Sequence, residues 1–195
     1  MRKYLMMTVL LGAICAGCVL KLEAVVTQRD IAKSVIRFHV LADSDEEYAQ
    51  EIKMKVKNQV ITYMEPVLKP AASVEESRSM IRDCLDEIEK IANGVLEEEG
   101  VPQTVTADLV TTWFPEKAYG DCTFPAGRYE ALQIKIGSAN GRNWWCVLYP
   151  GLCFEHSIRG VVSEEGKEKL SYVLTEEEMD TVLHEGKVKV RFRWF

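Results

Sequence analysis

The segment from Asn143 to Phe154 constrains the fold most, because it places two tryptophans side by side in a β-rich run. Neighbouring residues of a strand point to opposite faces of the sheet. Trp144 and Trp145 therefore share one core only if the strand is covered on both sides. We expect one indole to lie in a core and the other to meet a partner, a ligand or a covering helix.

A second β-rich run, from Val35 to Val40, alternates with the period of a strand. One face carries Ile36, Phe38 and Val40, and the other carries Val35, Arg37 and His39. Arg37 and His39 thus lie one pleat apart on the more polar face. His39 is either a hydrogen-bonded structural histidine or a part of a binding surface.

Three capping boxes predict the starts of helices, since a serine or threonine is followed three residues later by a glutamate. They are Ser44 with Glu47, Ser73 with Glu76, and Thr175 with Glu178. The first helix should end before Pro66, and the second should end at Gly100. The third should be short and end near Gly186.

The second of these helices has a heptad-like apolar stripe that fits either a coiled-coil dimer or a helix packed on a sheet, and we favour the sheet. Further strands are expected around Val105 to Phe114, Tyr129 to Gly137, and Trp144 to Tyr149. The expected fold class is α+β. A mixed or antiparallel sheet packs with two longer amphipathic helices and a short C-terminal helix, behind an N-terminal signal or anchor segment.

The loop from Pro115 to Ala126, which presents Tyr119, is longer than a hairpin needs. It either carries function or forms an irregular edge of the sheet.

The N-terminus begins with a short basic stretch followed by an uncharged apolar run from Leu5 to Leu20. This pattern predicts a signal peptide or a signal anchor over residues 1–20, with a lipoprotein site at Cys18 as a weaker alternative. Residues 21–30 read as a connector and residues 31–195 as one domain. The tail Lys187 to Trp194 alternates cationic and apolar residues, which suggests an edge strand or a membrane-binding strip.

The chain is acidic, with a formal net charge of −6. Removing the leader takes away two of the 24 basic residues and none of the 30 acidic ones, so the exported part carries about −8. Nucleic acid is therefore not expected as a partner. Contact with a membrane would run through the N-terminal segment if it is not cleaved. The oligomeric state is left open.

Four cysteines remain after the leader: Cys84, Cys122, Cys146 and Cys153. Cys146 and Cys153 flank a Tyr-Pro-Gly turn, so a disulfide between them is a candidate in an exported protein. Their spacing fits no common zinc site, and no metal or cofactor is expected. Catalysis by a thiol is disfavoured, because both cysteines lie in or beside a hydrophobic strand.

Several motifs occur in one order along the chain. They are Ile36-Arg37-Phe38-His39-Val40-Leu41-Ala42-Asp43-Ser44-Asp45, Trp113-Phe114-Pro115, Tyr119-Gly120-Asp121, Pro125-Ala126-Gly127-Arg128-Tyr129-Glu130-Ala131-Leu132 and the Asn143–Phe154 segment. Together, from about Ile31 to Phe154, they resemble the stage II sporulation protein R family. The resemblance implies a secreted intercellular signal of endospore-forming bacteria. Such a signal is made in the forespore, is exported into the intermembrane space, and activates a membrane-embedded aspartic protease that processes the sigma-E precursor.

On this reading the chain is a noncatalytic ligand of the protease, and its aromatic residues are the expected anchors. Candidate partner-binding residues are Arg37, His39, Tyr119, Asn143, Trp144 and Trp145. The alternative is an extracytoplasmic thiol-dependent or cell-wall-directed enzyme at the sporulation septum. A third reading is a structural protein of the septum.

Overall fold

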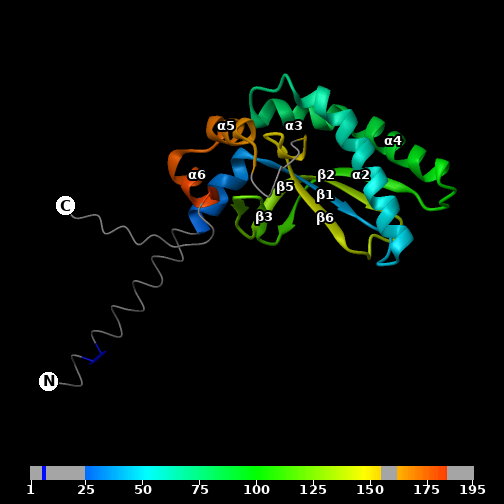
Figure 1. The fold of residues 1–195 in the computed structure, drawn as a ribbon, viewed down its shortest axis with the longest axis horizontal. Helices are drawn as coiled ribbons and strands as arrows, with labels where there is room; N and C mark the ends of the chain where they lie inside the picture. The colour runs from blue at the N-terminus through cyan, green and yellow to red at the C-terminus, as the bar shows by residue number, and fades with distance from the viewer. Residues whose placement is uncertain (1–5, 8–24, 155–161, 184–195) are drawn as a thin grey trace.

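The computed structural model describes residues 6–7, 25–154 and 162–183 (Figure 1). Its centre is a four-stranded sheet with the order β2-β5-β1-β6. The strands are β1 (Ile36–Leu41), β2 (Val105–Phe114), β5 (Gly127–Ile136) and β6 (Asn143–Tyr149). The β1 strand runs parallel to β5, whereas β1 with β6 and β2 with β5 are antiparallel. The sheet is therefore mixed, as expected for the α+β class.

One face of the sheet is covered by helices α2 (Glu47–Leu68), α3 (Val74–Asp83) and α4 (Leu85–Glu98), which lie together along one side in Figure 1. Phe38 and Val40 of β1 point into this layer and are fully buried, together with Val56 of α2. The α4 helix packs on both α2 and β2. The apolar stripe of the second predicted helix thus faces a helix and a sheet of the same chain.

The opposite face holds a second core, in which Ile31, Phe114 and Val147 are fully buried. Its cover comes from segments far apart in the sequence: helical residues 25–34, β3 (Lys117–Tyr119), β4 (Cys122–Phe124), η1 (Leu152–Phe154), α5 (Glu164–Val173) and α6 (Glu176–Leu183). The helix over residues 25–34 crosses the boundary expected between connector and domain. Both faces of the sheet are thus buried over part of their area.

The first helix differs from its prediction at both ends. It starts at Glu47 with Glu46 as N-cap, and the Ser44 hydroxyl accepts only from the Glu46 amide at 3.4 Å, so Ser44 does not cap it. It also continues through Pro66 to Leu68. Pro66 is tolerated because it lies in the last turn of the helix and is exposed, as is Thr62, the residue whose carbonyl would otherwise accept from position 66.

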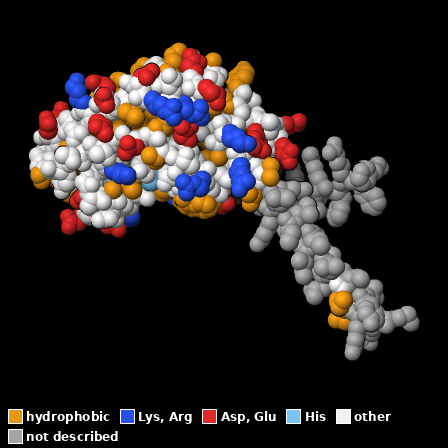
Figure 2. Space-filling model, turned by 180° about the vertical axis from the view of Figure 1, so that it is seen from behind, with side chains coloured by type: hydrophobic (Ala, Val, Ile, Leu, Met, Phe, Trp, Pro, Cys, Tyr) orange, Lys and Arg blue, Asp and Glu red, His pale blue; other side chains and the backbone are white. Residues whose placement is uncertain are grey.

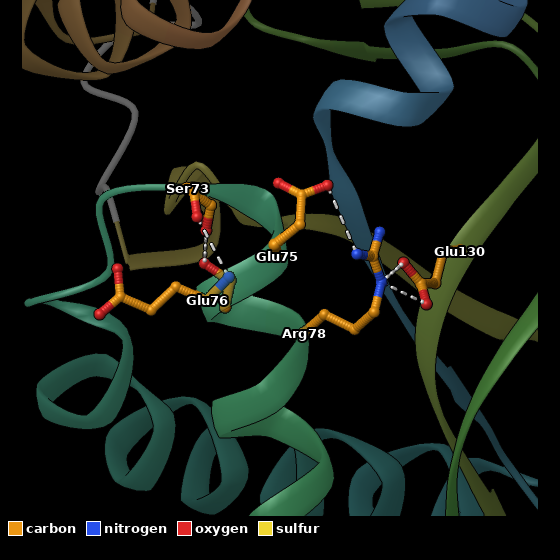
Figure 3. Close-up of polar contacts among 6 residues, drawn as sticks. Ser73, Glu75, Glu76, Arg78 and Glu130 are labelled. Carbon is orange, nitrogen blue, oxygen red and sulfur yellow. Dashed lines mark hydrogen bonds and ion pairs between the residues drawn. The ribbon is translucent and has the colours of Figure 1, made fainter.

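The second predicted helix is two helices, α3 and α4, which meet at Cys84 (φ −101°, ψ −3°). Its start is as predicted, because the Ser73 hydroxyl accepts from the Glu76 amide at 3.1 Å (Figure 3). Arg78 of α3 reaches Glu130 on β5, where its Nε atom lies 2.8 Å from Oε2.

The long loop after β2 is a two-stranded hairpin, β3 paired with β4, and is therefore more regular than expected. Near the C-terminus Thr175 accepts from the Glu178 amide at 3.3 Å, so the third capping box is confirmed as the start of α6. The α5 helix, capped by Ser163, was not predicted. Most of the apolar run of the leader, the whole tail from Lys187 to Trp194 and the predicted helix end near Gly186 lie outside the described residues.

Within the described ranges, no helix is long and apolar enough to cross a membrane.

Candidate functional site

Strand β1 places Arg37 and His39 on the sheet face that points away from α2. Phe38 between them packs into the helical layer, so the alternation predicted for this strand is confirmed. His39 lies opposite Gln133 of β5 and opposite Trp145 of β6. These pairs define a row of side chains across the sheet, which continues to Asp108 of β2.

Arg37 is fully buried and is surrounded by four aromatic rings. The guanidinium carbon lies 4.5 to 5.6 Å from the ring centres of Phe114, Tyr129, Phe124 and Tyr119. Its Nε donates to the Cys146 carbonyl at 3.1 Å, and Nη2 donates to the Tyr119 hydroxyl at 2.8 Å. The ion pairs found among the described residues do not include Arg37. The cation is therefore held by π faces and neutral oxygens.

His39 stacks on Trp145, with ring centres 3.9 Å apart and planes at 13°. Its Nδ1 atom lies 3.2 Å from the Gln133 amide nitrogen. With that amide donating to Nδ1, the ring proton lies on Nε2. Nε2 is buried and lacks a hydrogen bond of good geometry within the described part of the chain, although the Asn143 side chain interacts with the imidazole. Nη1 of Arg37 is likewise buried without a partner there.

Burial lowers the pKa of His39 to about 4. The Asn143 side chain opposes this shift, whereas the positive charges of Arg37 and Lys135 add to it. The imidazole is therefore neutral at pH 7, since its pKa lies well below that pH. A neutral histidine offers a directed N–H donor with no net charge.

Tyr119 reaches Arg37 from the β3–β4 hairpin, so the hairpin is the lid over the arginine. Burial raises the pKa of Tyr119 well above its ordinary value, and Arg37 opposes that shift. The tip of the hairpin is fastened to α5, because Asp121 Oδ2 lies 2.7 Å from Lys167 Nζ and Oδ1 accepts from the Val162 amide at 2.9 Å. The lid is thus tied both to the sheet and to the C-terminal helices.

The two tryptophans of β6 point to opposite faces, as the strand period requires. Trp145 lies with His39 and also meets Phe114, at 4.6 Å between ring centres. Trp144 lies on the other face, 5.5 Å from Phe38, with Lys57 Nζ of α2 5.0 Å from its ring centre. Trp144 is therefore the indole that lies under a covering helix, and the sheet separates it from the rest of the candidate site.

Of the six candidate residues, Arg37, His39, Tyr119 and Trp145 are brought together on one face. Asn143 is exposed on the same face, where it lies opposite Leu41 of β1.

The residues that sequence reasoning missed are those that complete the cluster: Phe114, Phe124, Tyr129 and Gln133. Gln133 had a local signal, since it is a polar residue inside the apolar run of β5. Phe114 and Tyr129 occur in the motifs of the family resemblance and Phe124 in the long loop, but nothing local marks the three as ligands of an arginine.

Among the described residues, the thiols of Cys122 and Cys153 are poorly suited to act as nucleophiles. Burial and the Asp121 charge raise the pKa of Cys122 to about 11, and burial with its neighbour Cys146 raises the pKa of Cys153 well above the ordinary value. Cys146 and Cys153 are free thiols that both lie against the Val147 carbonyl. A bridge between them stays a prediction. Within the described residues no group of acidic, histidine or cysteine side chains could hold a metal.

The lid covers only part of this sheet face. Asp108 and Asn143 are exposed, and Leu41, Lys135 and Trp145 are half-buried. Seen from behind in Figure 2, acidic, basic and hydrophobic side chains are interspersed over the described surface. A surface of this kind fits a protein partner better than a polyanion.

Comparison with known proteins gives one consistent result. The family model described as stage II sporulation protein R matches residues 32–185. A curated relative from Bacillus subtilis (strain 168) with the same name is 39% identical over 139 residues. The matched region is 71% of this chain and 62% of that relative, so the chain spans less than two thirds of the relative's length.

No solved structure matches the chain. The site residues Arg37, His39, Tyr119, Asn143, Trp144 and Trp145 all lie within the region matched by the family model. The order of motifs along the sequence and this match over most of the chain lead to the same conclusion: the chain belongs to the stage II sporulation protein R family.

Proposed function

We propose that this protein is a secreted signal of endospore formation that activates the membrane-embedded aspartic protease responsible for processing the sigma-E precursor. In this proposal it is made in the forespore and exported into the intermembrane space. It acts there as a ligand, without chemistry of its own. Membership of the sporulation family supports the sporulation role.

The geometry supports a binding role through one observation above all. A neutral, buried histidine stacks on a half-buried tryptophan, and the exposed Asn143 beside it interacts with the imidazole through its side chain. Aromatic rings with a few directed polar groups are typical of interface anchors. The partly open face around His39, Trp145 and Asn143 is therefore the proposed contact surface for the protease.

Activation would follow from differential affinity. A ligand shifts a two-state receptor only if it binds one state more tightly than the other. The proposed contact surface would thus bind the extracytoplasmic side of the active protease more tightly than that of the inactive protease. Export is part of the proposal, because contact from that side needs the chain on the far side of the forespore membrane.

The test is reconstitution in a nonsporulating bacterium that makes the chain, the protease and a tagged sigma-E precursor. Precursor cleavage, followed by immunoblot, should require this chain and its export. Replacing the exposed Asn143 with alanine should lower cleavage by about tenfold, the effect of removing one good interface contact. Asn58→Ala, an exposed asparagine on α2, is the matched control and should leave cleavage unchanged.

No cleavage with all three proteins present and folded would overturn the activation proposal. If both asparagine variants instead supported as much cleavage as the wild-type chain, the contact surface would have to lie elsewhere on the protein.

An extracytoplasmic thiol enzyme is the competing idea, and the raised pKa values of Cys122 and Cys153 weigh against it. If Cys122→Ser or Cys153→Ser folded normally but no longer supported any precursor cleavage, a thiol enzyme would again be favoured.

A further inference from the structure

Strand β2 is an edge of the sheet, and its first half is closed by side chains of α4. The Val105 amide donates to Asn93 Oδ1 at 2.9 Å, and the Asn93 amide nitrogen donates back to the Val105 carbonyl at 3.2 Å. The Ala107 amide donates to Glu89 Oε1 at 2.7 Å. These contacts show that the odd-numbered residues of β2 direct their backbone groups outward, away from β5.

The second half of the same edge is open. By the alternation of a strand, Leu109, Thr111 and Trp113 also direct their N–H and C=O groups outward. Among the described residues, the one contact there is from Arg128, whose Nη2 donates to the Thr111 carbonyl at 2.9 Å. Within the described residues, no backbone partner is found for these three amides.

This open half lacks the usual protection of an edge strand. Natural edges are blunted by lysine, proline, bulges or a covering element. Here five successive residues, Leu109 to Trp113, contain no charge and no proline. The Trp113 side chain is 60% exposed, which is unusual for a tryptophan in a sheet.

We infer that the open edge of β2, from Leu109 to Trp113, accepts an extended segment of the activated receptor as a fifth strand. The partner's identity rests on the proposed function, whereas the edge and its chemistry do not. Backbone groups would supply affinity, and alternate side chains would supply specificity, as in other cases of strand addition.

The side chains at the edge define the chemistry of that segment. On the site face an added strand would meet the exposed carboxylate of Asp108. On the other face it would meet Leu109 and Trp113. A segment in which basic and apolar residues alternate would place every basic side chain toward Asp108 and every apolar one toward Trp113.

A second copy of this chain is a poorer occupant. Two five-residue edges would bury on the order of a few hundred Å², below the roughly 1,000 Å² that a stable interface needs. Each copy is also acidic, with a formal net charge of −6, so the two would repel. The receptor avoids the area limit because Asp108 and Trp145 are the accessible ends of one row across the sheet, with the buried His39 and Gln133 between them, so a partner that reaches both ends would bury more than the edge alone.

The edge is tested in the same reconstituted cleavage assay with the full chain. Trp113→Ser and Thr111→Pro should each lower precursor cleavage by about tenfold or more, since one removes an anchor and the other removes an outward donor. Tyr172→Ser is the matched control, because Tyr172 is 79% exposed on α5 and should be replaceable without effect. Circular dichroism of each purified variant checks that it folds.

Hydrogen exchange of the wild-type chain gives a second readout that needs no substitution. The amides of Leu109, Thr111 and Trp113 should exchange fast in the free chain and become protected when the detergent-solubilised protease is added. The Val105 and Ala107 amides, already bonded to α4, should be slow in both states and serve as internal references.

The outcomes separate the two ideas. If the wild-type chain promotes no cleavage, the proposed function fails. If it promotes cleavage while both edge variants remain fully active and the three outward amides gain no protection, the edge inference is overturned and the proposed function stands. A wild-type chain that dimerises with protection of the same amides would replace the receptor strand by a second copy.

Discussion

At the scale of single residues, the unusual feature is a buried cation without a carboxylate among its described contacts. Burying an unpaired charge costs several kcal/mol in general. Arg37 offsets that cost with four aromatic faces and two neutral acceptors. A planar guanidinium can stack and donate in several directions at once, and a lysine ammonium cannot.

Arg37→Lys should therefore lower the free energy of unfolding by about 2 kcal/mol or more, because the ammonium loses ring stacking and at least one hydrogen bond. Arg128→Lys is the control, since Arg128 is exposed and makes one hydrogen bond, so its change should stay within about 0.5 kcal/mol. Urea unfolding of both variants measures the difference. Equal stabilities would mean that the aromatic cage contributes nothing specific to arginine.

At the scale of secondary-structure elements, the start of α3 depends on one serine. Ser73 accepts from the Glu76 amide, and the Glu76 carboxylate accepts from the Ala72 amide at 2.8 Å, so each side chain satisfies a backbone donor (Figure 3 shows Ser73 and Glu76). This start positions Arg78 for its bond to Glu130 on β5. The cap therefore contributes to the docking of α3 on the sheet as well as to the helix itself.

Ser73→Ala should destabilise the protein by about 1 kcal/mol, the usual effect of losing an N-cap. Ser79→Ala, at an exposed interior position of α3, should be neutral or slightly stabilising, because alanine is the better helix former. Thermal unfolding followed by circular dichroism compares the two variants. A larger loss from Ser79→Ala than from Ser73→Ala would contradict the capping role.

At the scale of the whole molecule, the sheet joins two cores, and the second contains a titratable group. His39 has a pKa of about 4 in the folded chain against 6.5 for the ordinary residue. Between these values the unfolded chain binds a proton that the folded chain does not. The stabilising effect of the neutral imidazole is therefore complete above pH 6.5 and is lost as the pH falls toward 4.

Acidification from pH 7 to pH 4 should thus remove roughly 3 kcal/mol of stability through His39 alone. His39→Gln lacks this titration, so its free energy of unfolding should fall less over the same range. Chemical unfolding at several pH values measures both curves. Parallel curves for the wild type and the variant would show that His39 is not held neutral by the fold.

Local sequence rules accounted for the elements whose signals are local. The alternation of β1, the opposite directions of Trp144 and Trp145, and the capping boxes at Ser73 and Thr175 each depend on residues within a few positions of one another, and all are present in the structure. The box at Ser44 was wrong, and so was the helix end at Pro66. The pattern also indicated which residues of β1 share a face.

Long-range contacts decided what the candidate site is. The pattern marked Arg37 and His39 as the polar side of a strand, but the β3–β4 hairpin covers Arg37, and the rings of Trp145 and Phe114 pack against His39, so both are buried. The parallel pairing of β1 with β5 brings Gln133 to His39, across 94 positions of sequence. Residue type and spacing carry local preferences, whereas burial depends on which distant segments the closing chain brings over a given face.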